Sequence, residues 1–202
     1  FAREKLEKQD GAFQVYFTGC SGNVTAGKYN DGSQQARSEL TQRLLAAMQA
    51  SVAATKYAPV ERIGWRALPV PLPVRTDREF TRAENAKIAA DAKGDPKGRV
   101  MAACRVAYHD RCAIPVEFSL LELGPVRVLH LPGEPFVEFQ LLAQRLAPKC
   151  FVAVAGYGDG GPGYLCTERS YSEGGYEPTG SMLAPHAEAI IGKAIAQLLQ
   201  TR

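Results

Sequence analysis

The fold class follows from residues 126–146, which read VRVLHLPGEPFVEFQLLAQRL. Residues 126–131 are a short β-prone run, and Pro132 and Gly133 end it. Pro135 suits the first position of a helix. The helix is then expected to bury one face, which carries Phe136, Phe139, Leu142 and Leu146. A strand that passes directly into an amphipathic helix is typical of an α/β layer structure.

Further β-prone runs lie on both sides of this unit. Residues 114–123 are joined to residues 126–131 by Gly124-Pro125, which predicts a hairpin. The segment 62–74 contains three prolines, which confine it to a sheet edge or a surface run. The other predicted strands are residues 13–18 and 151–155.

Helical patterns alternate with these strands. Ser33 can cap a helix over residues 33–53, in which Ala36, Leu40, Leu44 and Met48 repeat every four residues. The other predicted helices begin near Asp77, near Arg99 and at Pro185, where the terminal one has an apolar face. The sequence therefore predicts an α/β fold with a mixed sheet flanked by helices, forming a single domain or the larger half of one.

Composition excludes several functional classes. Hydrophobic residues make up 46% and charged residues 22%, which is typical of a globular protein. The formal net charge of +3 is too small and too dispersed to predict nucleic-acid binding. No apolar run approaches the ~20 residues of a transmembrane helix. The five cysteines have no paired spacing, so we expect buried free thiols rather than a zinc–thiolate site.

The run GYGDGG at residues 156–161 matches the glycine pattern of dinucleotide-binding loops. Such a loop must open a helix, whereas Pro162, Gly163 and the β-prone run 164–167 follow it here. We therefore expect tight turns beside a functional site, and no nucleotide.

Glu134 is the most informative single residue. It lies where a strand ends and a helix begins, which is where open α/β sheets place ligand sites. Its local sequence, taken alone, favours a solvated carboxylate at a helix N-terminus. His130 is expected to be a packed histidine or one that supports a ligand residue, and His109 and His186 have no partner by spacing. Cys20 ends a predicted strand. A nucleophilic cysteine needs a general base beside it, and no base is implied by position here.

Taken in order, four segments resemble the neutral/alkaline (non-lysosomal) ceramidase family. Residues 17–24 (FTGCSGNV) are similar to its strand and Gly-Asp loop, and residues 131–134 (LPGE) to its Pro-Gly-Glu motif. Residues 154–157, with Gly163-Tyr164-Leu165 and Thr167, resemble the next strand and loop. Residues 175–177 (GYE), with Ser181 and Pro185 beyond, resemble the segment that carries a zinc-binding tyrosine.

The resemblance implies that residues 1–202 are the C-terminal part of a zinc amidohydrolase catalytic domain, with Glu134 and Tyr176 as zinc ligands. The family's two zinc histidines precede the Gly-Asp loop and have no counterpart in this chain, so an upstream segment or a separate chain would supply them. Asn23 stands where the family usually has aspartate, and only Arg145 stands in a helix where ceramidases carry more arginines. No catalytic acid or base is assigned.

The implied reaction of the complete protein is hydrolysis of an N-acyl bond in a lipid-like substrate. We expect this chain to be inactive by itself and to hold zinc weakly or not at all. The alternative is a non-catalytic α/β scaffold or interaction protein without the zinc histidines. No sequence feature assigns a compartment, and the complete protein is compatible with a secreted or periplasmic location.

Three structural expectations follow. Glu134 and Tyr176 should converge although they are far apart in the sequence, since both follow strands at one sheet edge. The loop 156–163 should form a wall beside them. The chain should fold without metal, because three of its predicted helices have an apolar face.

Overall fold

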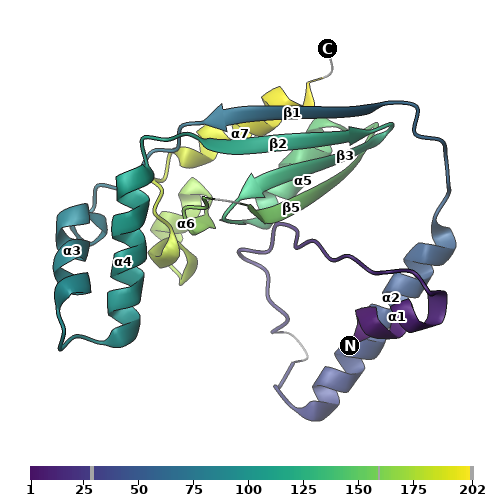
Figure 1. Ribbon diagram of the computed structural model, residues 1–202, viewed down its shortest axis with the longest axis horizontal. Coiled ribbons are helices and arrows are strands. Elements are labelled where there is room, and N and C mark those ends of the chain that lie inside the picture. The colour runs from purple at the N-terminus through teal and green to yellow at the C-terminus, as the bar shows by residue number, and fades with distance from the viewer. Residues whose placement is uncertain (28–29, 159, 201–202) are drawn as a thin grey trace. The chain divides into compact units, whose positions relative to one another are not determined.

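The computed structural model describes residues 1–27, 30–158 and 160–200 (Figure 1). The chain divides into two compact units. The N-terminal unit contains Phe1–Phe17 and Val24–Glu61. The second, which we call the sheet unit, contains Thr18–Asn23 and Arg62–Arg202.

The N-terminal unit is built around helix α2, Gln34–Ala54, which packs with α1, Ala2–Asp10. As predicted, Ser33 caps α2, and its hydroxyl accepts a hydrogen bond from the Ala36 amide at 3.0 Å. The predicted buried face of α2 is wrong, because Leu44 is 56% exposed. The nine-residue α1 is about 13 Å long and cannot cover a helix of 21 residues.

The predicted strand at residues 13–18 is also wrong. The described residues 11–19 form neither strand nor helix, and the side chains of Phe13, Val15, Tyr16 and Phe17 are exposed. Aromatic and β-branched residues favour a strand only where another strand and an apolar surface receive them. Within residues 13–18, the one backbone hydrogen bond found in the described structure joins the Gly156 amide to the Thr18 carbonyl at 2.8 Å.

The sheet unit contains the predicted mixed sheet. Its strands are β1 (Ile63–Val70), β2 (Val116–Leu123), β3 (Val126–Pro132) and β5 (Phe151–Gly158), in the order β1-β2-β3-β5. The β2–β3 hairpin is antiparallel, as predicted, and β1 is an edge strand. The pair β3–β5 is parallel, and α5 (Val137–Leu146) makes the crossover between them.

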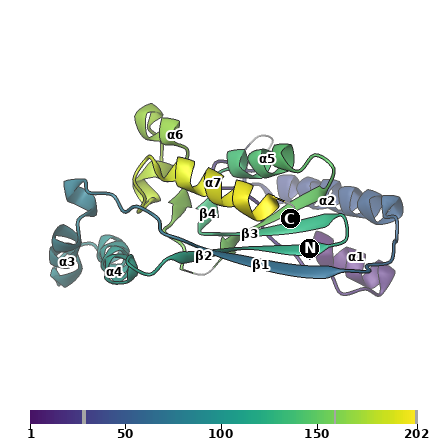
Figure 2. The same ribbon diagram turned by 90° about the horizontal axis from the view of Figure 1, so that it is seen from above.

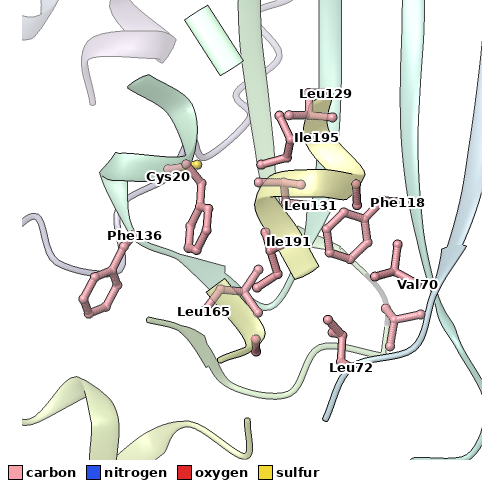
Figure 3. Packing of buried hydrophobic residues seen from close by; sticks show 14 of the residues in the cluster. Cys20, Val70, Leu72, Phe118, Leu129, Leu131, Phe136, Leu165, Ile191 and Ile195 are labelled. Carbon is pink, nitrogen blue, oxygen red and sulfur yellow. The ribbon is translucent and has the colours of Figure 1, made fainter. Parts of the chain in front are cut away.

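One face of this sheet is covered by α5 and by α7, Ala187–Leu199 (Figures 1 and 2). Figure 3 shows Ile191 and Ile195 of α7 beside Leu131 and Phe118 of the sheet. All four side chains are essentially buried. The apolar faces predicted for α5 and α7 are therefore confirmed at their centres, although Leu146 at the end of α5 is exposed.

Smaller elements complete the sheet unit. An α-helical hairpin, α3 (Arg82–Ala90) and α4 (Pro96–Arg111), follows the short helix η1, Arg78–Phe80. The helix predicted from Asp77 thus begins later, where the Thr81 hydroxyl accepts from the Glu84 amide at 3.4 Å. The remaining elements are β4 (Glu134–Pro135), β6 (Tyr164–Leu165), α6 (Glu168–Glu173) and η2 (Glu177–Gly180). Of the helices described, none is both long enough and apolar enough to cross a membrane.

Candidate functional site

The candidate site is built on the turn Pro132-Gly133-Glu134 at the carboxyl end of β3. Backbone hydrogen bonds hold this turn from two sides. The Tyr157 amide donates to the Gly133 carbonyl at 2.6 Å, and the Glu134 amide donates to the Gly163 carbonyl at 2.9 Å. Glu134 is therefore fixed by main-chain contacts at the end of the sheet where β3 and β5 both end.

Glu134 does not begin a helix. Glu134 and Pro135 form the short strand β4, which pairs in parallel with β6. The Phe136 amide donates to the Leu165 carbonyl at 3.0 Å, so the chain is still extended at Pro135. The expectation that Pro135 occupies the first helical position is wrong, because this pairing delays α5 until Val137.

Asn23, in the loop resembling the ceramidase Gly-Asp loop, caps α5. Its side-chain oxygen accepts from the Val137 amide at 2.9 Å, and its side-chain nitrogen donates to Glu138 at 2.8 Å. The same loop approaches the turn where the Gly22 amide donates to the Pro135 carbonyl at 2.9 Å. The local sequence suggested that Glu134 lies at this helix N-terminus, but Asn23, which is distant in the sequence, caps the helix.

One tyrosine lies beside Glu134, and a second contacts the first. Tyr164 is its direct partner in the β4–β6 pair. The rings of Tyr164 and Tyr176 meet edge to face, with centroids 6.0 Å apart and an interplanar angle of 80°. Tyr176 is 71% exposed, whereas Tyr164 is half-buried. Glu134 and Tyr176, the two predicted ligands, are therefore both neighbours of Tyr164.

The electrostatic environment of Tyr164 is acidic. Burial is the main cause that raises the pKa of its phenol to about 12, and the negative charge of Glu134 is the next. Tyr176, Glu177 and Tyr157 raise this pKa further. Tyr164 therefore keeps its proton at neutral pH unless a cation is bound nearby.

Sequence reasoning did not select Tyr164 as a site residue. Its place beside Glu134 depends on the parallel pairing of two strands of two residues each, which no periodicity reveals. The available signal was its position in Gly163-Tyr164-Leu165, a segment included in the family resemblance.

The loop 156–163 packs against the turn, as predicted. A Cβ atom added to Gly161 would lie 2.5 Å from the Gly133 backbone. The loop continues into β6, and the next helix, α6, begins only at Glu168. Asp159 of this loop lies outside the described residues. Nucleotide binding is untested, and its absence stays a prediction.

Tyr157 has an unusual backbone conformation. Its φ is 62°, the one positive value among the described residues other than glycine. The hydroxyl of Tyr157 lies 3.2 Å from that of Ser21. Such a conformation costs about 1–2 kcal/mol for a residue with a side chain, and residues of this kind concentrate at functional sites.

The histidines and Cys20 make no site of their own. His130 packs against Trp65, with ring centroids 5.4 Å apart, and its buried Nδ1 has no hydrogen-bond partner within the described segments. His109 lies 2.6 Å from the Phe80 carbonyl through Nε2. Burial raises the pKa of the Cys20 thiol to about 12, which opposes a nucleophilic thiolate. Cys20 and Cys166 are buried free thiols as expected, whereas Cys104 is exposed.

The donors present fit part of a zinc site. Zinc takes carboxylate, imidazole and thiolate ligands, usually four in all. Around Glu134 the described residues offer a carboxylate and phenols, and nowhere in them do three or more His, Cys, Asp or Glu form a group that could hold a metal. Imidazole ligands would have to come from another segment or chain.

Comparison with known proteins gives structural matches. No protein-family model matches this sequence, and no curated protein sequence matches it either. The structure is similar to neutral ceramidase from Pseudomonas aeruginosa, with a TM-score of 0.65 and 14% sequence identity over 98% of this chain. It is also similar to a ceramidase complexed with C2, with a TM-score of 0.55 and 14% identity over 82% of this chain.

The chain spans 38% and 34% of the lengths of these two ceramidase chains. At this sequence identity the matches establish the fold. The fold of this chain resembles that of neutral ceramidase over nearly its whole length, as the resemblance of its motifs predicted.

Proposed function

We propose that this chain is the ceramidase-like part of a zinc-dependent amidohydrolase that hydrolyses an N-acyl bond of a lipid-like substrate. The observation that carries the proposal is the pairing of Glu134 with Tyr164 at the carboxyl end of β3, beside Tyr176. The family resemblance, together with the fold shared with neutral ceramidase, supports zinc as the metal.

In this proposal Glu134 and Tyr176 bind zinc, together with two histidines from an upstream segment or a separate chain. When bound, zinc acidifies a water molecule to a pKa of about 7 and polarises a carbonyl group. Glu134 suits its role because three backbone hydrogen bonds fix the turn that carries it. Tyr157 and the loop 156–163 form one wall of the site.

Tyr164 is a second candidate for the phenolic ligand. It is the direct pairing partner of Glu134, whereas Tyr176 is related to Glu134 only through its ring contact with Tyr164. If Tyr176 binds zinc, the raised pKa of Tyr164 keeps a protonated phenol at the site. Such a phenol can donate a hydrogen bond to a carbonyl oxygen that becomes negative during amide hydrolysis.

The test is zinc content and amide hydrolysis of the complete protein, with the substitutions Glu134→Gln, Tyr164→Phe and Tyr176→Phe. We expect Glu134→Gln and one tyrosine variant to lose zinc, measured by elemental analysis. The other tyrosine variant should keep zinc and lose hydrolysis of a short-chain N-acylsphingosine. Glu173→Gln and Tyr57→Phe are matched controls, since both side chains are exposed and neither residue belongs to the turn or to the strands that pair with it.

A complete protein with neither zinc nor amidase activity would contradict the proposal and support the alternative, a non-catalytic scaffold or interaction protein. Zinc retained in all three site variants would contradict the ligand assignment alone.

A further inference from the structure

The chain that leads into Tyr176 does not fix the position of this residue. Gly174 and Gly175 precede it with φ values of 80° and 113°, a region that glycine enters without steric cost. The Tyr176 side chain is 71% exposed, and its ring contacts that of Tyr164. The position of Tyr176 therefore depends on the segment that follows it, η2 (Glu177–Gly180).

Tyr176 is tied to η2, and two arginines hold η2 from outside. The Thr179 amide and hydroxyl donate to the Tyr176 carbonyl, at 3.1 and 2.6 Å. Arg75 donates through Nη1 to the Pro178 carbonyl at 2.8 Å, and Arg105 donates through Nη2 to the Thr179 carbonyl at 3.0 Å. A single 3₁₀ turn has few hydrogen bonds of its own, so these outside contacts help to fix it.

The two guanidinium groups are themselves fixed by stacking. The Cζ atoms of Arg75 and Arg105 lie 3.8 and 4.5 Å from the centroid of the Phe80 ring, and Phe80 is buried. The Arg75 side chain is only 13% exposed, and its Nε donates to Asp77 at 2.6 Å. A guanidinium stacked on a ring donates hydrogen bonds in its own plane, so its direction toward a carbonyl is defined.

This arrangement places two positive charges close together. Burial is the main cause that lowers the pKa of the Arg105 guanidinium, the negative charge of Glu79 opposes this change, and the positive charge of Arg75 adds to it. Burying such charges costs free energy, which apolar packing of the α-helical hairpin against η2 would avoid. The arginines therefore provide what apolar packing does not, which is directed hydrogen bonds to the backbone of η2.

We propose that Arg75 and Arg105 are positioning residues, which fix Tyr176 at the candidate site through η2. The role of Tyr176 itself rests on the proposed function, but its placement can be measured without zinc or substrate. Arg105 lies on α4 and Phe80 in η1, so the α-helical hairpin and the turn before it support the site from outside.

The test is fluorine NMR of the 202-residue chain labelled with meta-fluorotyrosine. The signal of Tyr176 is assigned by its absence in Tyr176→Phe. In Arg105→Gln we expect this signal to move toward the chemical shift of free meta-fluorotyrosine, because the ring loses its fixed contact with Tyr164. Circular dichroism verifies that each variant folds.

Arg82→Gln is the matched control. It removes the same charge from the same α-helical hairpin, where Arg82 forms an exposed ion pair with Asp110 at 2.6 Å, and it should leave the Tyr176 signal in place. Arg105→Lys keeps the charge and a donor but not the planar fork, so it should move the signal in the same direction by less. It decides the test by itself if Arg105→Gln does not fold.

A Tyr176 signal that stays in place in the folded Arg105 variants, or that moves equally in Arg82→Gln, would overturn the proposal. In the complete protein, Arg105→Gln should also lower kcat/KM for amide hydrolysis by about tenfold to a hundredfold, and Arg82→Gln should not. A displaced Tyr176 signal with unchanged hydrolysis would instead contradict the role of Tyr176 in the proposed function.

Discussion

Gly133 shows how little space surrounds Glu134. Its φ is 61°, and an added Cβ atom would lie 2.4 Å from the Gly163 carbonyl oxygen. Both atoms belong to backbone that is fixed by the turn, so neither can move away easily. The approach of the two chains that places Glu134 beside Tyr164 therefore requires glycine at this position.

We predict that Gly133→Ala lowers the free energy of unfolding by about 3 kcal/mol or more. Gly124→Ala is the control, because Gly124 has a φ of 55° but open space around its Cα. It should show the backbone cost alone, about 1 kcal/mol. Urea denaturation measures both. Equal costs for the two variants would show that the clash at Gly133 is relieved by movement of the loop.

Tyr157 presents the opposite case, a side chain where glycine would fit better. Replacing it with glycine relieves about 1–2 kcal/mol of strain and costs about 0.5–1 kcal/mol of backbone entropy. We predict that Tyr157→Gly leaves stability unchanged or raises it by up to about 1 kcal/mol. Tyr157→Phe, which keeps the strain and removes the hydroxyl near Ser21, should show no gain. A clear loss of stability in Tyr157→Gly would mean that the ring itself stabilises the fold.

The sequence predicts the position of Glu134 at a strand end better than it predicts which side chains lie near it. A β-prone run followed by Pro-Gly-Glu places a carboxylate at a strand end, and local pattern suffices for that. The proximity of Tyr164 arises from a pairing between segments that are distant in the chain. The edge-to-face contact of Tyr176 likewise depends on the path of the chain from β6 through α6 to η2.

Helix α5 depends on a residue from another part of the chain. Asn23 accepts from the Val137 amide and donates to the Glu138 carboxylate. This double contact requires an amide, since an aspartate would accept from Val137 but repel Glu138. The departure from aspartate that the family resemblance revealed therefore has a structural explanation in this chain.

We predict that Asn23→Ala lowers the free energy of unfolding by about 1 kcal/mol, the usual cost of a lost cap. Asn23→Asp should also destabilise at neutral pH. Combining it with Glu138→Gln should restore stability, because the glutamine can donate to the new carboxylate. A double-mutant cycle from urea denaturation measures the coupling. Additive effects would show that Asn23 and Glu138 do not interact in solution.

The helices that pack an apolar face against the sheet are the elements that the sequence predicts best. The buried residues of α7 follow the 3.6-residue period, and their partners on β2 and β3 receive them. Residues 13–18 and the face of α2 have equally apolar patterns, yet Phe13 and Leu44 stay exposed. An apolar pattern is thus buried in one place and exposed in another, depending on whether another surface packs against it. The pattern itself does not contain that information.

The molecule as a whole concentrates its core in the sheet unit. The hydrophobic cluster unites β1, β2, β3 and β5 with α5 and α7, and its members include Phe118, Leu129 and Ile195. Glu134 and Tyr176 are not among the described members of this cluster, whereas the Tyr164 side chain packs against it. Folding and metal binding are therefore expected to be separable in this chain.

The 202-residue chain should fold without zinc and bind zinc weakly or not at all. Glu134 and a tyrosine give two oxygen donors, and a phenol binds zinc well only when it is ionised. The pKa of Tyr164, about 12, opposes ionisation, and within the described residues no imidazole joins these donors in a metal-binding group. Dialysis against a mild chelator, followed by elemental analysis and thermal unfolding, is the measurement. We expect less than stoichiometric zinc and a melting temperature that the chelator does not change. Stoichiometric zinc that is lost on Tyr176→Phe or Tyr164→Phe, with a lower melting temperature after chelation, would instead mean that this chain holds a complete site.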